Sequence, residues 1–220
     1  MFNLDLVELP KVKQVNEEGS RYYTSDGEVK YPSVTTILGA DPEKIKSLQE
    51  WRKRVGEEKA NQISRQAATK GTNVHACIEA YIQNQEVPEV MPHEMESFLL
   101  LKSAADKYID NIKCIEGKML SHHLRCAGTV DCVANYRGKM AIIDWKTSAR
   151  LKKKTMIDGY FKQAAAYAVM FEENTGIPVE QLIIIMACGT GQLQLFKESR
   201  DDWIDKFISQ RDYYEQEWTK

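Results

Sequence analysis

The stretch GTVDCVANYRGKMAIIDWKTS, residues 128–148, decides how this chain folds. Two runs that alternate between the two faces of a strand flank Arg137-Gly138, which suits a tight hairpin loop. A two-residue loop pairs Val133 with Ile142; a four-residue loop keeps that register, whereas a three-residue bulged loop would shift it. The stretch therefore predicts an antiparallel hairpin with one apolar face, on which the opposed pairs are Val130 with Trp145, Cys132 with Ile143 and Ala134 with Ala141.

The other face of the predicted hairpin carries charge. Asp131 lies opposite Asp144, and Thr129 lies opposite Lys146. Like charges that face each other across strands are destabilising, so this face needs a cation. Lys146 compensates in part. A divalent metal that bridges the carboxylates compensates better, because Mg²⁺ binds one or two carboxylates and then substrate phosphates. A metal beside a lysine at a strand end suits phosphodiester hydrolysis.

An ordinary exposed hairpin is the alternative interpretation. The triplet D-x-K is short and common, and alone it favours Asp–Lys pairs on a solvated face. Two features favour a site instead: the opposed second aspartate, and the run MAIID, which keeps Ile142 on the carboxylate face.

Periodicity and turn residues predict further elements on both sides of the hairpin. The first forty residues are turn-rich and predict short strands, followed by a short helix over 34–38 that Ser33 caps and Gly39 ends. Residues 41–112 predict a helical section with breaks near Gly56, Gly71 and 88–92. The other expected elements are strands over 113–121, 124–136, 139–147, 182–187 and 193–196, and helices over 155–174 and 200–217.

This order of elements predicts an α/β (α+β) fold in which helices flank a central mixed β-sheet, with an N-terminal helical section. The length of 220 residues suits one domain, 1–220, in which 41–112 form the helical section and 113–220 the core.

The charge of the chain is segregated. Thirty Lys and Arg residues against 32 Asp and Glu give a net charge of −2, which excludes a uniformly basic coat. Residues 44–70 nevertheless hold eight basic against three acidic side chains, and residues 150–162 hold five against one. Residues 198–217 are acidic, with seven acids against three bases. Because the two basic stretches flank the hairpin, nucleic acid remains a candidate partner.

Several function classes find no support in the sequence. The five cysteines are odd in number and widely spaced without C-x-x-C, so we expect free thiols rather than disulfides or a zinc site. No apolar run approaches 18 residues, and the start MFNLDLVELP resembles neither a secretory signal nor a transit peptide. We therefore expect a soluble, cytoplasmic protein without a membrane partner. The absence of G-x-x-x-x-G-K-[ST] argues against a nucleotide cofactor or motor.

Five motifs together resemble one family. In chain order they are PSVTTIL (32–38), GTNVHACIE (71–79), a carboxylate at Glu116, the hairpin with IIDWKT, and Q-A-A-A-Y (163–167). The set is similar to the PD-(D/E)XK nuclease superfamily, in its RecB-like exonuclease branch. The hairpin most resembles that of mitochondrial genome maintenance exonucleases and related phage exonucleases.

The resemblance implies roles for named residues. His75, Asp131 and Asp144 would hold Mg²⁺ or Mn²⁺, and Glu116 would contribute more weakly, through water. Lys146 would orient or activate the attacking water, while Gln163 and Tyr167 would assist at the phosphate. Without the resemblance, a lone histidine such as His75 is more often structural, and Glu79, one turn further on, is an orienter of His75 or simply an exposed acid.

The resemblance also implies a nucleic-acid path. The basic section would form a helical arch that admits a threaded single strand, although a solvated helix is the usual fate of such charge runs. The chain would then be a metal-dependent deoxyribonuclease, namely an exonuclease that acts on single-stranded DNA in replication, recombination or repair. A phage or bacterium fits as its source. A flap or junction endonuclease and a non-catalytic DNA-binding relative remain the alternatives. The DNA-contacting candidates are Ser33, Thr35, Thr36, Arg52, Arg54, Arg65, Lys70, Arg150 and Lys152.

Overall fold

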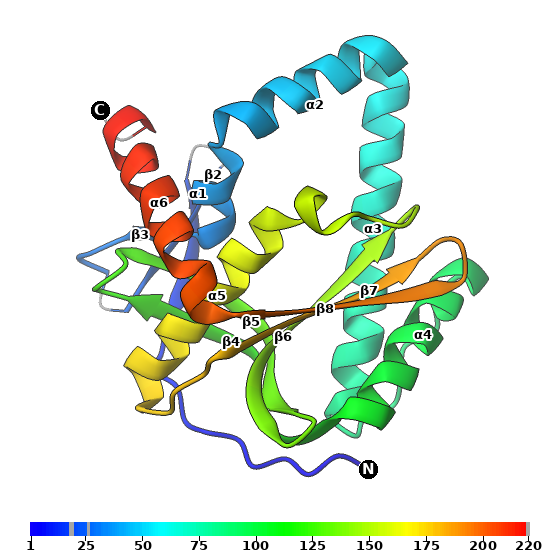
Figure 1. Cartoon of the computed structure of the whole chain (residues 1–220), viewed down its shortest axis with the longest axis vertical. Coiled ribbons are helices and arrows are strands. Elements are labelled where there is room, and N and C mark those ends of the chain that lie inside the picture. Colours follow the sequence, from blue (N-terminus) through cyan, green and yellow to red (C-terminus); the bar gives the residue numbers. More distant parts are fainter. Residues whose placement is uncertain (18–19, 26, 219–220) are drawn as a thin grey trace.

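A computed structural model describes residues 1–17, 20–25 and 27–218. Two sheets form its framework (Figure 1). The small sheet contains β1 (Lys13–Glu17), β2 (Ser20–Thr24) and β3 (Tyr31–Pro32) in that order. The large sheet has the order β4-β5-β6-β7-β8, with bounds Ile109–Ser121, Cys126–Tyr136, Lys139–Ser148, Gln181–Cys188 and Gln192–Ser199.

The large sheet is mixed because a helix joins β6 to β7. Strands β4, β5 and β6 form an antiparallel meander, and β7 pairs with β8 in the same way. The crossover through α5 (Asp158–Thr175) makes β6 and β7 parallel. The expected α+β class with a helix-flanked mixed sheet is therefore confirmed.

Helices cover both faces of the large sheet. On one face, Ile142 and Phe161 belong to a core that also includes α1 (Val34–Gly39) and α6 (Ile204–Trp218). On the other face, Ile143 packs in a core with Ile78 and Leu101, which come from α3 (Glu57–Ile82) and α4 (Pro92–Tyr108). Short 3₁₀ turns precede α5 and α6, at Lys154–Met156 and Arg200–Asp202.

The predicted hairpin forms with its two-residue loop. Arg137 has φ 51° and Gly138 φ 81°, as a type I′ turn requires. The predicted register holds from Tyr136–Lys139 to Cys132–Ile143. It ends there, so the expected pairings of Asp131 with Asp144, Thr129 with Lys146 and Val130 with Trp145 were wrong. Beyond this point β5 continues to pair with β4, and β6 continues to pair with β7.

The helical section begins as expected and then departs from the prediction. Ser33 caps α1, and Asp41 caps α2 (Pro42–Val55). Gly56, with φ 87°, ends α2. The break expected at Gly71 is wrong, because α3 continues through it without interruption. The section also ends earlier than predicted, since β4 begins at Ile109.

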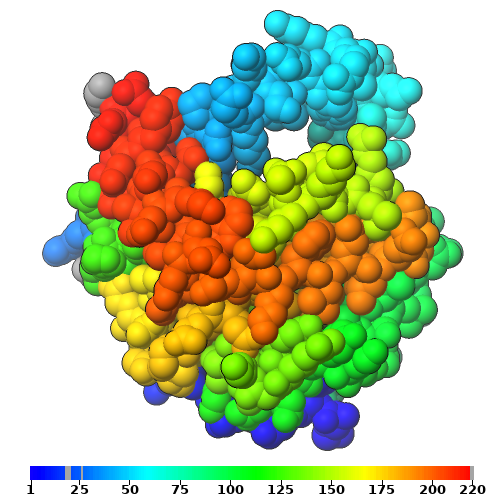
Figure 2. Space-filling model, viewed as in Figure 1, coloured from blue at the N-terminus to red at the C-terminus, as the bar shows by residue number. Residues whose placement is uncertain are grey.

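The helix α2 and the first half of α3 project away from the core. None of the described residues of α2 is buried, and in residues 57–70 of α3 only Ala60 is. Figure 2 shows an opening between these helices and the segment that follows β6. We call α2 and residues 57–70 the arch. Among the described residues, every helix is too short or too polar to serve as a membrane span.

Candidate functional site

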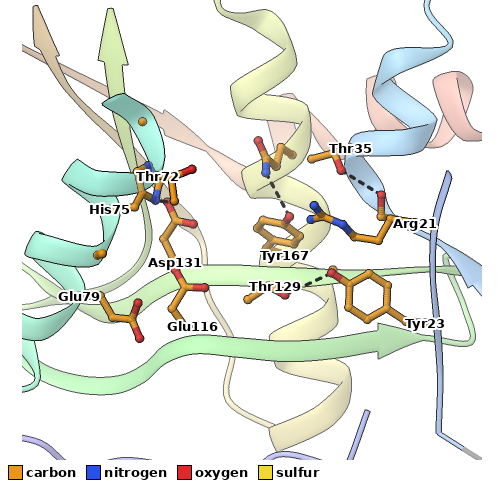
Figure 3. Close-up of a pocket in the computed structure, with 15 residues that line it drawn as sticks. Arg21, Tyr23, Thr35, Thr72, His75, Glu79, Glu116, Thr129, Asp131 and Tyr167 are labelled. Atoms are coloured by element: carbon orange, nitrogen blue, oxygen red, sulfur yellow. Dashed lines mark hydrogen bonds and ion pairs between the residues drawn. The ribbon is translucent and has the colours of Figure 1, made fainter. Parts of the chain in front are cut away.

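A cavity of about 520 Å³ lies where α3, α5 and the strands β4 and β5 meet. It gathers five of the residues that the sequence predicted for catalysis: His75, Glu116, Asp131, Gln163 and Tyr167. Figure 3 shows the histidine and the carboxylates at one end and Tyr167 towards the other. Among the polar lining residues, sequence reasoning assigned no role in the site to Arg21, Tyr23, Thr72 and Thr129.

A cluster of possible metal ligands occupies one end of this cavity. One ligand atom each from His75, Glu116 and Asp131 lie within 4.8 Å of one another. The Nδ1 atom of His75 is 3.7 Å from Oδ2 of Asp131. All three side chains are partly buried, so they are shielded from bulk water but remain open to a ligand. Helix α3 supplies the histidine, and the sheet supplies the two carboxylates.

Local backbone geometry directs Glu116 into the cluster. It lies between the paired residues Ile115 and Gly117 of β4, with φ 48° in the left-handed region. Such a conformation is costly for a residue other than glycine and is found most often at functional sites. The next position must be glycine, because a Cβ at Gly117 would lie 2.1 Å from Sγ of Cys114.

Asp131 is fixed by the backbone of the neighbouring strand. The N–H of Trp145 donates a hydrogen bond of 3.0 Å to its Oδ2 atom. This bond forms where the hairpin register ends, so the divergence of β5 from β6 leaves a backbone donor free for the carboxylate. One oxygen of Asp131 is thereby oriented before any ligand arrives.

Asp144 and Lys146 form an ion pair outside the cavity lining. The side chain of Asp144 is buried, and the Nζ atom of Lys146 is 2.7 Å from its Oδ1 and 2.6 Å from its Oδ2. Oδ2 is fully buried and receives no well-directed hydrogen bond from the described residues. A carboxylate oxygen with spare acceptor capacity, near the partly buried His75 and the carboxylate of Asp131, fits a divalent cation.

Burial and the repulsion between neighbouring carboxylates raise the pKa values of two of these side chains. Burial raises the pKa of Glu116 to about 7, and the charges of Asp131 and Glu79 add to the effect. Burial likewise raises the pKa of Asp144 to about 6; Lys146 opposes the shift and Asp131 adds to it. Burial alone would lower the pKa of Lys146, but Asp144 and Asp131 outweigh it and raise the pKa above its usual value. Bound positive charge would relieve this repulsion.

The expected pair on α5 faces the cavity. Gln163 donates a hydrogen bond of 3.1 Å from Nε2 to the Tyr167 hydroxyl, and Tyr167 is buried. Its ring requires glycine opposite, because a Cβ at Gly128 would lie 2.7 Å from Cε1 of Tyr167. One turn earlier, the Tyr160 ring lies 5.1 Å from Nζ of Lys146. The spacing 160, 163 and 167 marks one helix face, a signal that the sequence already contained.

The DNA-contacting candidates are divided among several places. Ser33 and Thr35 line the cavity, although the Ser33 hydroxyl also caps α1 by accepting from the N–H of Thr36. Arg52 is engaged in the arch, where it pairs with Glu57 and donates to Asn61. The other candidates are outside this cavity. Thr36 borders two smaller hollows near α1, and Arg65 and Lys70 line a second cavity. None of these cavities is lined by the remaining three, Arg54, Arg150 and Lys152.

Comparison with known proteins gives sequence relatives of one kind. No family model matches the chain. Human mitochondrial genome maintenance exonuclease 1 is 27% identical over 173 residues, which cover 73% of this chain and 50% of the relative. The Xenopus tropicalis protein of the same name is 29% identical over 188 residues, covering 78% and 52%. The chain is a homologue of these exonucleases.

The homology confirms the resemblance that the five motifs indicated. The chain spans about half the length of the curated relatives it matches. A solved structure from Eubacterium rectale, described as a candidate exonuclease, covers 66% of this chain and 64% of its own. It is 14% identical with a TM-score of 0.45, which is too loose to bear on function.

Proposed function

We propose that this chain is a metal-dependent deoxyribonuclease that degrades single-stranded DNA from an end, in replication, recombination or repair. One observation carries the proposal: His75, Glu116 and Asp131 converge in a cavity next to the Lys146–Asp144 ion pair. That combination of hard ligands and a nearby ammonium suits phosphodiester hydrolysis better than acyl transfer or redox chemistry.

The donor set fits Mg²⁺ or Mn²⁺. His75, Asp131 and Asp144 would hold the ion, and Glu116, which belongs to the same cluster as His75 and Asp131, would contribute directly or through water. When bound, such an ion polarises a phosphate oxygen and lowers the pKa of a coordinated water.

The residues of the chain supply position and charge. The Trp145 N–H fixes Asp131, so the ligand oxygen need not reorganise. The Lys146 ammonium, which contacts Asp144 and lies 5.1 Å from the Tyr160 ring, would orient the attacking water and offset charge on the phosphate. The Gln163 amide and the Tyr167 hydroxyl are donors at the far wall.

The arch supports action on a single strand that has a free end. It lacks core contacts, it borders the opening of Figure 2, and it carries the basic stretch 44–70. An opening of this kind admits a flexible strand more readily than a stiff duplex. The proposal divides the chain into a helical arch section, 41–112, and a nuclease core, 113–220, with His75 contributed by the former.

Incubation with a labelled single-stranded oligonucleotide tests the proposal. We expect stepwise shortening with Mg²⁺ or Mn²⁺ and none with EDTA. The Asp144→Asn variant should be inactive while its thermal unfolding stays cooperative. Absence of metal-dependent cleavage by the wild-type protein would refute nuclease activity and favour a non-catalytic DNA-binding relative.

A structure-specific endonuclease is the second candidate, and substrate topology separates the two. An exonuclease that threads its substrate should degrade linear strands and spare covalently closed circles. Equal degradation of the circle would refute threading. Cleavage at one internal position of a flap or junction with blocked ends would favour the endonuclease.

A further inference from the structure

A second cavity, of about 720 Å³, lies on the other side of α3 from the metal-ligand cluster. Its walls come from residues 63–70 of α3, residues 91–94 around the start of α4, and residues 147–149 at the end of β6. At 100° per residue, its α3 residues and those of the first cavity centre on nearly opposite helix faces. We call it the rear cavity.

The two cavities adjoin across one helix. Gly71 lines the first cavity, and a Cβ placed on it would lie 3.9 Å from Oγ1 of Thr147, which lines the rear cavity. A helix with its side chains is about 10–12 Å across, and this helix presents no large side chain at Gly71. Because α3 and β6 are this close at Gly71, a strand held at the metal cluster would reach the rear cavity through the opening beside the arch rather than between Gly71 and Thr147.

The rear cavity combines apolar surface with cations. Ile63 and Met91 face it although 39% and 61% of their surfaces are exposed, which is unusual for large apolar side chains in one hollow. Arg65 and Lys70 also line it, and neither has an ion-pair partner among the residues that the structure describes. An apolar surface beside unpaired cations matches a nucleoside and its phosphate, because bases stack on apolar groups and phosphates need cations.

Glu94 decides the orientation of such a ligand. Its carboxylate is 3% exposed, lines the rear cavity, and accepts hydrogen bonds from Nδ2 of Asn73 at 2.9 Å and from the N–H of Met91 at 3.0 Å. A carboxylate has further acceptor sites, and it repels phosphate. The base therefore lies towards Glu94 and Met91, and the phosphate towards Arg65 and Lys70.

We propose that the rear cavity binds one nucleoside of the substrate strand, a short distance along the strand from the bond that is cut. The inference rests on the proposed nuclease function and adds a base-contacting subsite to it. It implies that a base at one fixed position contributes to cleavage, whatever its sequence.

An abasic scan tests the subsite. A single abasic residue is moved along a labelled oligonucleotide, and the Mg²⁺-dependent cleavage rate is measured under subsaturating conditions. We expect a loss of about 5- to 100-fold at one distance from the cut bond and small effects elsewhere, as removal of one stacked base gives.

Variants assign that loss to the rear cavity. The double variant Ile63→Ala/Met91→Ala should cleave intact and abasic strands at similar rates, because its apolar surface is gone. Leu99→Ala is the matched control, since Leu99 is 51% exposed on α4 and does not line the cavity. It should keep the full position dependence.

Three outcomes separate the two proposals. A flat scan with the wild-type protein, or a position effect that survives in the double variant, overturns the subsite while the nuclease assignment stands. Failure of the wild-type protein to cleave the intact strand with either metal overturns the nuclease assignment itself.

Discussion

The two halves of α3 serve opposite purposes. Residues 57–70 are exposed apart from Ala60 and the partly covered Lys70, whereas residues 71–82 bury Val74, Cys77, Ile78 and Ile82 against the sheet. The buried half aims His75 at the carboxylates, and the exposed half extends into the arch. A helix that is polar all round gains little from packing, so the arch half depends on continuity with the core half. The helix α3 thus carries both His75 of the metal-ligand cluster, which we call the fixed site, and the exposed surface of the arch.

The largest expected effect is at the fixed site. Lys146→Ala removes the ammonium that contacts both oxygens of Asp144, and we expect the cleavage rate to fall by about 1,000-fold or more. Single-turnover rates with Mg²⁺ measure the loss, and circular dichroism checks the fold. Lys139→Ala, which truncates an exposed lysine at the start of β6, is the control and should retain activity. Comparable rates for the two variants would remove Lys146 from the site.

Stability should distinguish the halves of α3 most directly. Ile78→Ala deletes a side chain that is 1% exposed, and buried truncations of this kind cost about 2–5 kcal/mol. Ile63→Ala truncates the same residue type in the arch half, where 39% of it is exposed, and should cost no more than about 0.5 kcal/mol. Urea unfolding at equal protein concentration measures both. Similar losses would mean that the arch half packs as firmly as the core half.

The sequence predicted the fold to the extent that local periodicity determines it. The hairpin loop and its register followed from Arg137-Gly138 and period-two alternation. The break predicted at Gly71 failed because the buried residues that follow it, such as Val74, Cys77 and Ile78, anchor the helix against the sheet, and such packing overrides the weak local propensity of one glycine. The divergence of β5 from β6 beyond the pair Cys132–Ile143, on the side away from the hairpin loop, depends on where β4 and β7 pair, which short-range patterns do not specify.

The candidate site was predictable by residue type but not by geometry. His75, Asp131, Gln163 and Tyr167 line one cavity, as the motifs implied. Glu116 was expected as a weak contributor, yet with its left-handed backbone it lies in the same cluster as His75 and Asp131, and periodicity cannot reveal a single positive φ. The ladder pairing expected between Asp144 and Asp131 does not form, whereas the expected compensation of Asp144 by Lys146 does, because Asp144 lies buried against that ammonium. Whether each residue acts as proposed stays a prediction.

The fixed site should also be less stable without its cation, and pH tests this. Glu116 has a pKa of about 7 in the folded protein, above its usual value of 4.5, so between these values the folded state binds more protons than the unfolded state. Raising the pH through this window therefore lowers the free energy of unfolding, and the loss is complete above pH 7. The substitution Glu116→Gln removes this loss of stability. In EDTA we expect this variant to be about 1–2 kcal/mol more stable than wild type at pH 8, with no difference at pH 4.

Urea midpoints at the two pH values measure this difference. The same substitution at Glu86, an exposed loop residue, should change neither midpoint. Mg²⁺ at pH 8 should stabilise the wild-type protein more than Glu116→Gln, because it neutralises the carboxylates. An advantage of the variant that is equal at both pH values would show that charge repulsion is not its cause.

The smallest effect is expected on the arch side, where charge acts through affinity rather than turnover. Arg65→Gln/Lys70→Gln removes two cations that face the rear cavity, and should weaken single-stranded DNA binding severalfold with little change in the rate at saturating substrate. Each lost phosphate contact lowers the slope of log K against log salt by about 0.7, so the pair should lower it by about 1.4. Fluorescence anisotropy in EDTA over a range of salt concentrations gives both values.

Lys118→Gln/Lys139→Gln neutralises two exposed lysines of the large sheet and should keep the wild-type slope. If instead both double variants shift the slope equally, the DNA follows total charge, and the division of α3 into a fixed half and a DNA-contacting half fails.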